Sequence, residues 1–131
     1  MSAAVIDTNV LVFDTFEDSE FHMEASNRLD SIEKWYLPDI VFHELMWFFK
    51  SEEYDLSRAR FKVEEYLTHE KSVFSQCTTD DVRFASKVNN YSDYNDFIIL
   101  SIAKRLQFPL FTFDGELIKK AGRHGVQTMK M

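Results

Sequence analysis

Cysteine, glycine and proline are scarce in this chain, which holds one Cys, three Gly and two Pro among 131 residues. The lone Cys77 can form neither an internal disulfide nor a thiolate metal site. Three glycines cannot build a glycine-rich phosphate-binding loop. Because no repeat and no linker rich in glycine, serine or proline divides the chain, we expect a single domain over residues 1–131.

Long apolar runs are also absent. No stretch reaches the roughly 18 residues that a membrane-spanning helix needs, and the N-terminus lacks the pattern of a secretion signal. We therefore expect a cytoplasmic protein with no membrane partner. Two hydrolase motifs are missing too, since Trp47 replaces the second histidine of a zinc-protease motif begun at His43, and no Gly-x-Ser-x-Gly segment occurs.

Aromatic and acidic residues, by contrast, are plentiful. Hydrophobic residues make up 45% of the chain and include 13 Phe, so the chain can bury a substantial core. The formal charge of −7 argues against simple electrostatic binding of nucleic acid. The charge is uneven, because residues 1–103 hold 20 acids and 9 Lys or Arg, whereas residues 104–131 hold 2 acids and 6 bases.

Short apolar runs alternate with segments of helical periodicity. Strands are predicted at residues 3–7, 35–38, 72–76, 109–113 and 126–130. Helices are predicted at residues 18–34, from 39 through Glu44, and at 57–70, 78–90, 92–107 and 115–125. This alternation predicts an α/β fold, a three-layer α/β/α sandwich with a mostly parallel central sheet of four to five strands.

Two carboxylates fall on apolar helix faces. Glu44 shares its face with Ile40, Val41, Trp47 and Phe48. Asp96 is followed at helical spacing by Ile99, Leu100 and Ala103, and Asp93 lies one turn before it. A buried acid without a partner costs several kcal/mol or becomes protonated, and neither Glu44 nor Asp96 has a Lys or Arg within four residues on its helix.

Two further carboxylates, Asp7 and Asp114, each end an apolar strand. The carboxyl ends of parallel strands form the edge of the sheet where ligand crevices open, so four acids from four segments can meet at one rim. Three of the acids also have a simpler explanation, whereas Glu44 and Asp96 do not. Asp7 is a good helix cap, Asp114 precedes Gly115 as a turn or cap residue, and Asp93 is chiefly expected to cap the helix at 92–107.

Close carboxylates repel one another, and a divalent cation relieves this repulsion. Ligation by oxygen alone suits Mg²⁺ or Mn²⁺. Such ions neutralise a phosphodiester and activate a water for in-line attack, and four acids suit either one ion or two ions about 4 Å apart.

The segments VIDTNVLV, LPDIVFHEL and YNDFIILSIAKRLQFPLFTFD occur in this order over nearly the whole chain. Together they resemble the PIN domain, in particular the VapC-type toxins of bacterial and archaeal toxin–antitoxin pairs. The resemblance implies a metal-dependent ribonuclease that leaves a 5′-phosphate and a 3′-hydroxyl. It makes the four acids both catalytic and metal-binding, namely Asp7, Glu44, Asp96 and Asp114.

The resemblance also implies supporting residues and partners. Thr8, Asn9 and Thr112 would hydrogen-bond to the carboxylates or to metal-bound water, Asp93 competes with Asp96, and Glu116 is either an auxiliary acid or a first-turn residue favoured by the helix dipole. A homodimer and a cognate antitoxin whose tail covers the acidic site are expected. Candidates for RNA contact, each equally well explained as solvated charge, are Lys104, Arg105, Lys119, Lys120, Arg123 and Lys130.

Two other functions remain open from the sequence. One is a PIN-like module that binds RNA or protein without catalysis, against which the complete set of four acids argues. The other is a metal-dependent phosphatase of receiver-like α/β fold, which would form a covalent aspartyl-phosphate.

Overall fold

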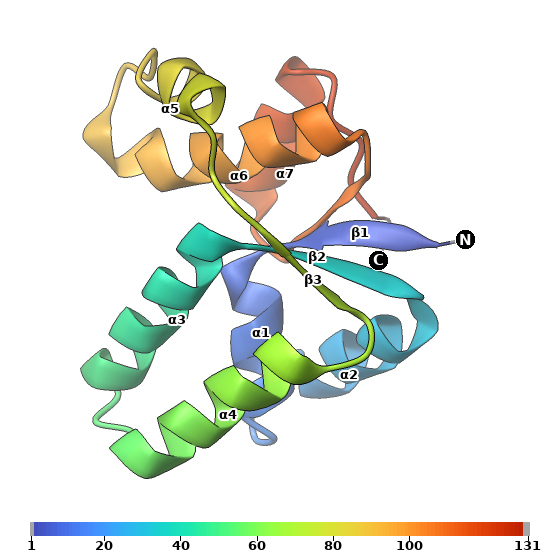
Figure 1. Cartoon of the computed structure of the whole chain (residues 1–131), viewed down its shortest axis with the longest axis vertical. Coiled ribbons are helices and arrows are strands. Elements are labelled where there is room, and N and C mark those ends of the chain that lie inside the picture. The colour runs from blue at the N-terminus through green and yellow to red at the C-terminus, as the bar shows by residue number, and fades with distance from the viewer. Residues whose placement is uncertain (1, 130–131) are drawn as a thin grey trace.

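The computed structural model describes residues 2–129, in which a parallel four-stranded sheet lies between two layers of helices (Figure 1). The strands are β1 (Ala3–Ile6), β2 (Lys34–Pro38), β3 (Ser72–Ser75) and β4 (Leu110–Phe111), in the spatial order β3-β2-β1-β4. Register is set by pairs such as Val5 with Tyr36 on one side and with Leu110 on the other. The predicted α/β/α sandwich is confirmed.

The helices divide between the two faces of the sheet. Below it in Figure 1 lie α1 (Thr8–Thr15), α2 (His22–Ser31), α3 (Asp39–Ser51) and α4 (Leu56–Thr68). Above it lie α5 (Thr79–Ala85), the 3-10 turn η1 (Tyr91–Asp93), α6 (Tyr94–Leu106) and α7 (Gly115–Arg123). Because helices cover both faces, the central strand β1 carries an uninterrupted buried run, Ala4 to Ile6.

The order of the strands creates a crevice. The chain runs outward from β1 through β2 to β3, and then returns to place β4 on the opposite side of β1. Such a reversal separates the loops that leave neighbouring strands, and ligands of open α/β sheets bind at this point. The two strands that flank the reversal, β1 and β4, are the ones followed by Asp7 and Asp114.

Several predicted elements are shorter than expected. The predicted strand at 126–130 is reduced to one isolated bridge between Thr128 and Leu110, and Lys130 lies outside the described residues. The helix predicted at 18–34 begins only at His22, because the Ser19 hydroxyl donates to the carbonyls of Phe13 and Phe16 and holds a turn there. The helix predicted at 78–90 ends at Ala85, before a polar segment with two asparagines.

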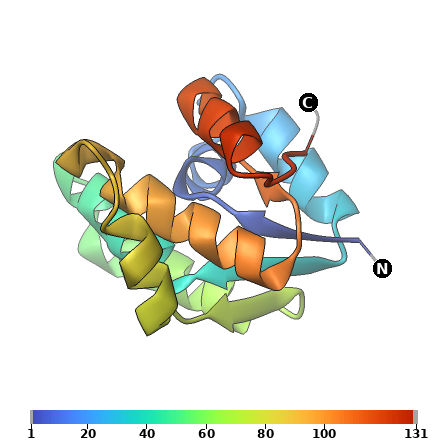
Figure 2. The same cartoon turned by 90° about the horizontal axis from the view of Figure 1, so that it is seen from above.

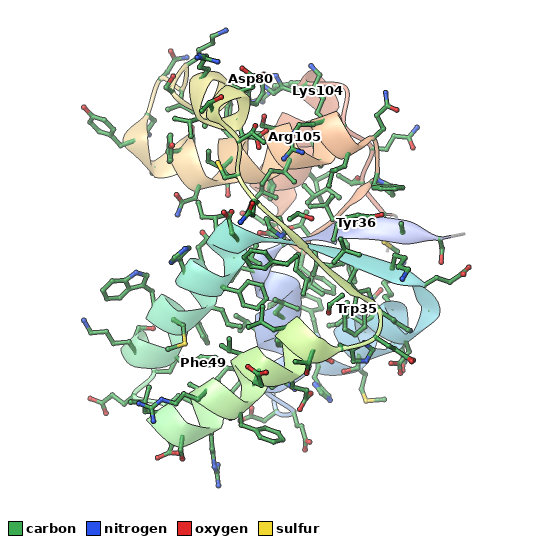
Figure 3. All side chains as sticks on the ribbon, viewed as in Figure 1. Trp35, Tyr36, Phe49, Asp80, Lys104 and Arg105 are labelled. Carbon is green, nitrogen blue, oxygen red and sulfur yellow. The ribbon has the colours of Figure 1, made fainter. Side chains whose placement is uncertain are left out.

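The apolar face assigned to α3 was wrong in one respect. Its core-facing residues are Val41, Leu45 and Phe49, whereas Trp47 is 64% exposed. Figure 3 shows Phe49 directed into the layer between the helices below the sheet. Glu44 therefore lies at the border of the buried stripe and is half-buried rather than enclosed by it.

Among residues 2–129, no helix is both long enough and apolar enough to span a bilayer.

Candidate functional site

Asp7 lies at the carboxyl end of β1 and is buried. One carboxylate oxygen accepts from the Thr8 backbone N–H at 2.8 Å, so Asp7 caps α1. The other accepts from the Thr112 hydroxyl at 2.7 Å, which ties β1 to the segment after β4. The cap and the rim position predicted for Asp7 therefore occur together.

Asp114 likewise caps the helix that it precedes. Its Oδ1 accepts from the backbone N–H groups of Glu116 and Leu117 at 2.9 and 3.4 Å. Its own N–H donates to the Thr112 hydroxyl oxygen at 3.0 Å. Thr112 thus connects the two strand-end acids through one buried hydroxyl.

Glu44 reaches the same region from α3. Its Oε1 accepts from the Thr8 hydroxyl at 2.6 Å, and its Oε2 accepts from the Asn95 side-chain amide at 3.3 Å. Thr8 and Asn95 belong to α1 and α6, so Glu44 joins helices from both layers. Asn95 was missed by the sequence analysis, because an exposed amide on a helix carries no pattern of its own.

Lys120 of α7 lies against the acids of α6. Its Nζ donates to Asp93 at 2.9 Å and to Asp96 at 3.1 Å, and its side chain is only 15% exposed. The capping hydrogen bond expected of Asp93 is not made, because Asp93 stands at the N-cap position just before α6 but its side chain accepts no bond from the helix. Asp96 has no Lys or Arg within four residues on its helix, and its cationic partner lies 24 residues along the chain.

The four acids line one open pocket of about 410 Å³. Apolar side chains form part of its wall, and its complete lining is Asp7, Thr8, Asn9, Val12, Phe13, Glu44, Phe48, Asp96 and Asp114. Four separate elements supply the carboxylates, so only the folded chain brings them together.

Negative charge is poorly solvated at the base of this pocket. Burial, together with the nearby carboxylates of Glu44 and Asp96, raises the pKa of Asp7 from 3.8 to about 7, even though its two hydrogen bonds lower it. Burial also raises the pKa of Asp96, outweighing Lys120, which lowers it. Two acids of the site therefore favour protonation more than ordinary aspartates do.

The remaining predicted supporting residues fall into two groups. Asn9 is part of the network, because its amide donates to the Thr112 hydroxyl oxygen at 3.3 Å and its Oδ1 accepts from the Phe113 N–H at 3.2 Å. Glu116 is exposed, and its carboxylate is bound by Lys119 at 3.5 Å. Its backbone, rather than its side chain, contacts the site.

The basic residues of the C-terminal segment make different contacts. Lys120 is bound between two acids of the site, and Arg105 holds the buried Asp81 at 2.9 Å. Figure 3 shows Lys104 and Arg105 on the upper side of the molecule, above the sheet. Within residues 2–129, Lys104 and Arg123 are exposed and make no ion pair.

A family model for the PIN domain matches residues 4–123 of the chain. The chain belongs to the PIN domain family. This PIN domain has no match among curated protein sequences.

Solved structures share the fold at low sequence identity. VapC20 of Mycobacterium tuberculosis, described as a toxin that cleaves the sarcin–ricin loop, has a TM-score of 0.78 at 14% identity, with coverage of 99% of this chain and 100% of VapC20. VapBC2 of Rickettsia felis, bound to promoter DNA, has a TM-score of 0.70 at 15% identity, with 98% of each chain covered. A toxin–antitoxin complex of Klebsiella pneumoniae has a TM-score of 0.65 at 23% identity, with coverage of 95% and 96%.

The chemical type of the candidate ligands in this PIN domain suits a hard divalent cation, because all four are carboxylates. Among the described residues, no cationic side chain offsets the negative charge of the buried Asp7. In their present arrangement, however, no group of three or more His, Cys, Asp or Glu within residues 2–129 could hold a metal ion. Lys120 supplies the positive charge nearest to Asp96.

Proposed function

We propose that this PIN domain is a single-domain, Mg²⁺- or Mn²⁺-dependent endoribonuclease of the VapC type. The observation that carries the proposal is the convergence of Asp7, Glu44, Asp96 and Asp114 on one open pocket at the reversal point of the sheet. The cation, once held by these carboxylates, would neutralise the scissile phosphate and lower the pKa of its bound water.

The surrounding residues have separate tasks in this proposal. The Thr8 and Thr112 hydroxyls orient Glu44 and Asp7, so that each keeps lone pairs directed at the pocket. Lys120 keeps Asp96 near Asp93 and limits the charge that would repel an RNA phosphate. The Asn95 amide hydrogen-bonds the Glu44 carboxylate to α6 and restricts the rotamers of Glu44.

The test is cleavage of RNA by the purified protein with Mg²⁺, with Mn²⁺ and with EDTA. We expect metal-dependent cleavage that leaves 5′-phosphate ends. Asp7→Asn and Glu44→Gln should each lower the rate by about a hundredfold or more. Asp80→Asn is the matched control, since Asp80 is an exposed acid at the top of Figure 3 that pairs with Arg83 and does not line the acidic pocket. Undiminished metal-dependent cleavage by both pocket variants would overturn the proposal.

A binding module without catalysis is the second candidate. It is favoured because, within residues 2–129, no three candidate ligands are arranged to hold a metal ion. It is also favoured because Lys120 already forms ion pairs with Asp93 and Asp96. Binding of RNA without turnover across Mg²⁺, Mn²⁺ and several substrates would select it.

Partners follow from the same proposal. We propose a homodimer in the cytoplasm, and a cognate antitoxin that covers the acidic pocket. The support is the likeness in fold to VapBC2 and to a Klebsiella pneumoniae toxin–antitoxin complex. Light scattering of the purified protein tests the dimer. Co-purification with the product of an adjacent gene tests the antitoxin.

A further inference from the structure

A second pocket lies beside the acidic one, on the other side of the first turn of α6. It has a volume of about 620 Å³ and is lined by Ser86, Val88, Asn89, Asn90, Tyr91 and Tyr94. Tyr94 lines this pocket, Asp96 lines the acidic pocket, and Asn95 between them donates to Glu44. One helical turn therefore borders both pockets.

The wall of this second pocket is ordered by its own hydrogen bonds. The N–H groups of Lys87 and Val88 donate to the carbonyls of Phe84 and Ala85 at 3.2 and 3.3 Å. Asn90 accepts from the Ser92 N–H at 3.1 Å through its side chain. In Figures 1 and 2 this segment forms the connection between α5 and the start of α6, at the left of both views. The pocket is thus largely built before a ligand arrives.

The residues that line this second pocket are uncharged, and two of them are aromatic. Tyr91 is 97% exposed, so its ring contributes almost nothing to the core, and Tyr94 is half-buried one turn later. In the part of the chain that the structure describes, the Asn89 side chain makes no hydrogen bond, which leaves an amide donor and an acceptor free at the pocket. Aromatic faces beside a free amide are the means by which proteins hold unpaired bases.

The charge of the chain favours this kind of contact over phosphate binding. The net charge is −7, and Lys120, which contacts Asp96 of the acidic pocket, is already paired with two acids. Stacking of a base on an aromatic ring needs no positive charge and accepts any base. RNA bound to this protein would therefore draw affinity from its bases more than from its phosphates.

We infer that the pocket of Tyr91, Tyr94 and Asn89 is a base-binding subsite that holds one unpaired nucleotide of a single-stranded RNA segment next to the acidic pocket. The inference rests on the proposed activity toward RNA and adds to it the form of the substrate. A duplex cannot present an unstacked base at this position, so single strands, loops or bulges are the expected substrates.

The test is the affinity of the protein for fluorescein-labelled A12, C12 and U12 RNA and for a 12-base-pair RNA duplex, measured by anisotropy in EDTA. The single strands should bind more tightly than the duplex. Tyr91→Ala should raise the Kd for single strands about five- to hundredfold, the range expected for one stacked base. Tyr91→Phe keeps the ring and should remain within about twofold of the unmutated protein.

Two comparisons separate stacking from other causes. Phe61→Ala is the control, because Phe61 is 70% exposed on α4, outside both pockets, and its loss should leave the Kd unchanged. The slope of log Kd against log salt should be the same for Tyr91→Ala and the unmutated protein, because no phosphate contact is removed. Thermal melting checks that each variant is folded.

The inference is overturned if the unmutated protein binds none of these RNAs, if Tyr91→Ala binds as tightly as the unmutated protein, or if Phe61→Ala weakens binding equally. A Tyr91 variant that keeps RNA affinity but loses a protein partner would make the pocket a protein-docking site instead. Because binding is measured without metal, it is independent of turnover. Binding that depends on Tyr91 without cleavage would refute only the nuclease, and cleavage without Tyr91-dependent binding would refute only the subsite.

Discussion

Ionised Asp7 should lower the free energy of unfolding of the metal-free protein at neutral pH, and Asp7→Asn should raise it. The carboxyl is buried, and its pKa of about 7 in the folded chain compares with an ordinary value of 3.8. At 1.36 kcal/mol per pKa unit, ionised Asp7 costs the folded state roughly 4 kcal/mol. The hydrogen bonds from Thr112 and Thr8 already lower this pKa and are included in the cost, so Asp7→Asn should raise the free energy of unfolding by nearly the full amount, roughly 3–4 kcal/mol, at pH 8.

The sign of the pH dependence follows from proton binding. Between pH 4 and pH 7 the folded chain retains a proton on Asp7 that the unfolded chain has lost, so the free energy of unfolding falls as pH rises through this interval. The gain from Asp7→Asn should therefore be absent near pH 4, grow toward pH 7 and level off above it.

The assay is thermal unfolding in EDTA at several pH values between 4 and 8, with Asp55→Asn as control. A gain of roughly 3–4 kcal/mol corresponds to a rise of about 9–20 °C in Tm at pH 8. Asp55 is fully exposed, and the Ser57 hydroxyl lowers its pKa, so its replacement should give no gain that grows with pH. A gain for Asp7→Asn that is equal at pH 4 and pH 8, or a lower Tm at pH 8, would refute the reasoning.

Two further predictions concern charge and packing. Lys120→Met should lower the free energy of unfolding in EDTA at pH 8 by about 1–2 kcal/mol, because it leaves two adjacent, partly buried carboxylates at Asp93 and Asp96 without their cation. The loss should be smaller at pH 4, because burial raises the pKa of Asp96 and favours its neutral form there. Equal losses at both pH values in denaturant titrations would contradict this. Trp47→Ala should change stability by no more than about 0.5 kcal/mol, whereas Phe49→Ala should cost about 3–5 kcal/mol. Similar losses for both would mean that Trp47 is packed in solution.

The distinction between Trp47 and Phe49 shows where periodicity stops being informative. Both are large aromatic residues on α3, and helical spacing placed Trp47 on the face of Glu44. Spacing defines which residues share a face, but not which face meets the sheet, because that depends on how the whole helix is rotated against its neighbours. The buried residues Val41, Leu45 and Phe49 reveal the rotation only in the folded chain.

The sequence by itself determined the layered α/β architecture and the positions of the four acids, because apolar runs, caps and periodicity are local properties. It could place Asp7 and Asp114 at strand ends, and a parallel sheet then brings such ends to one edge. Tertiary structure alone decided what the acids contact. Lys120 reaches Asp96 across 24 residues and Thr8 reaches Glu44 across 36, and these pairs depend on the packing of separate helices, which no local pattern encodes.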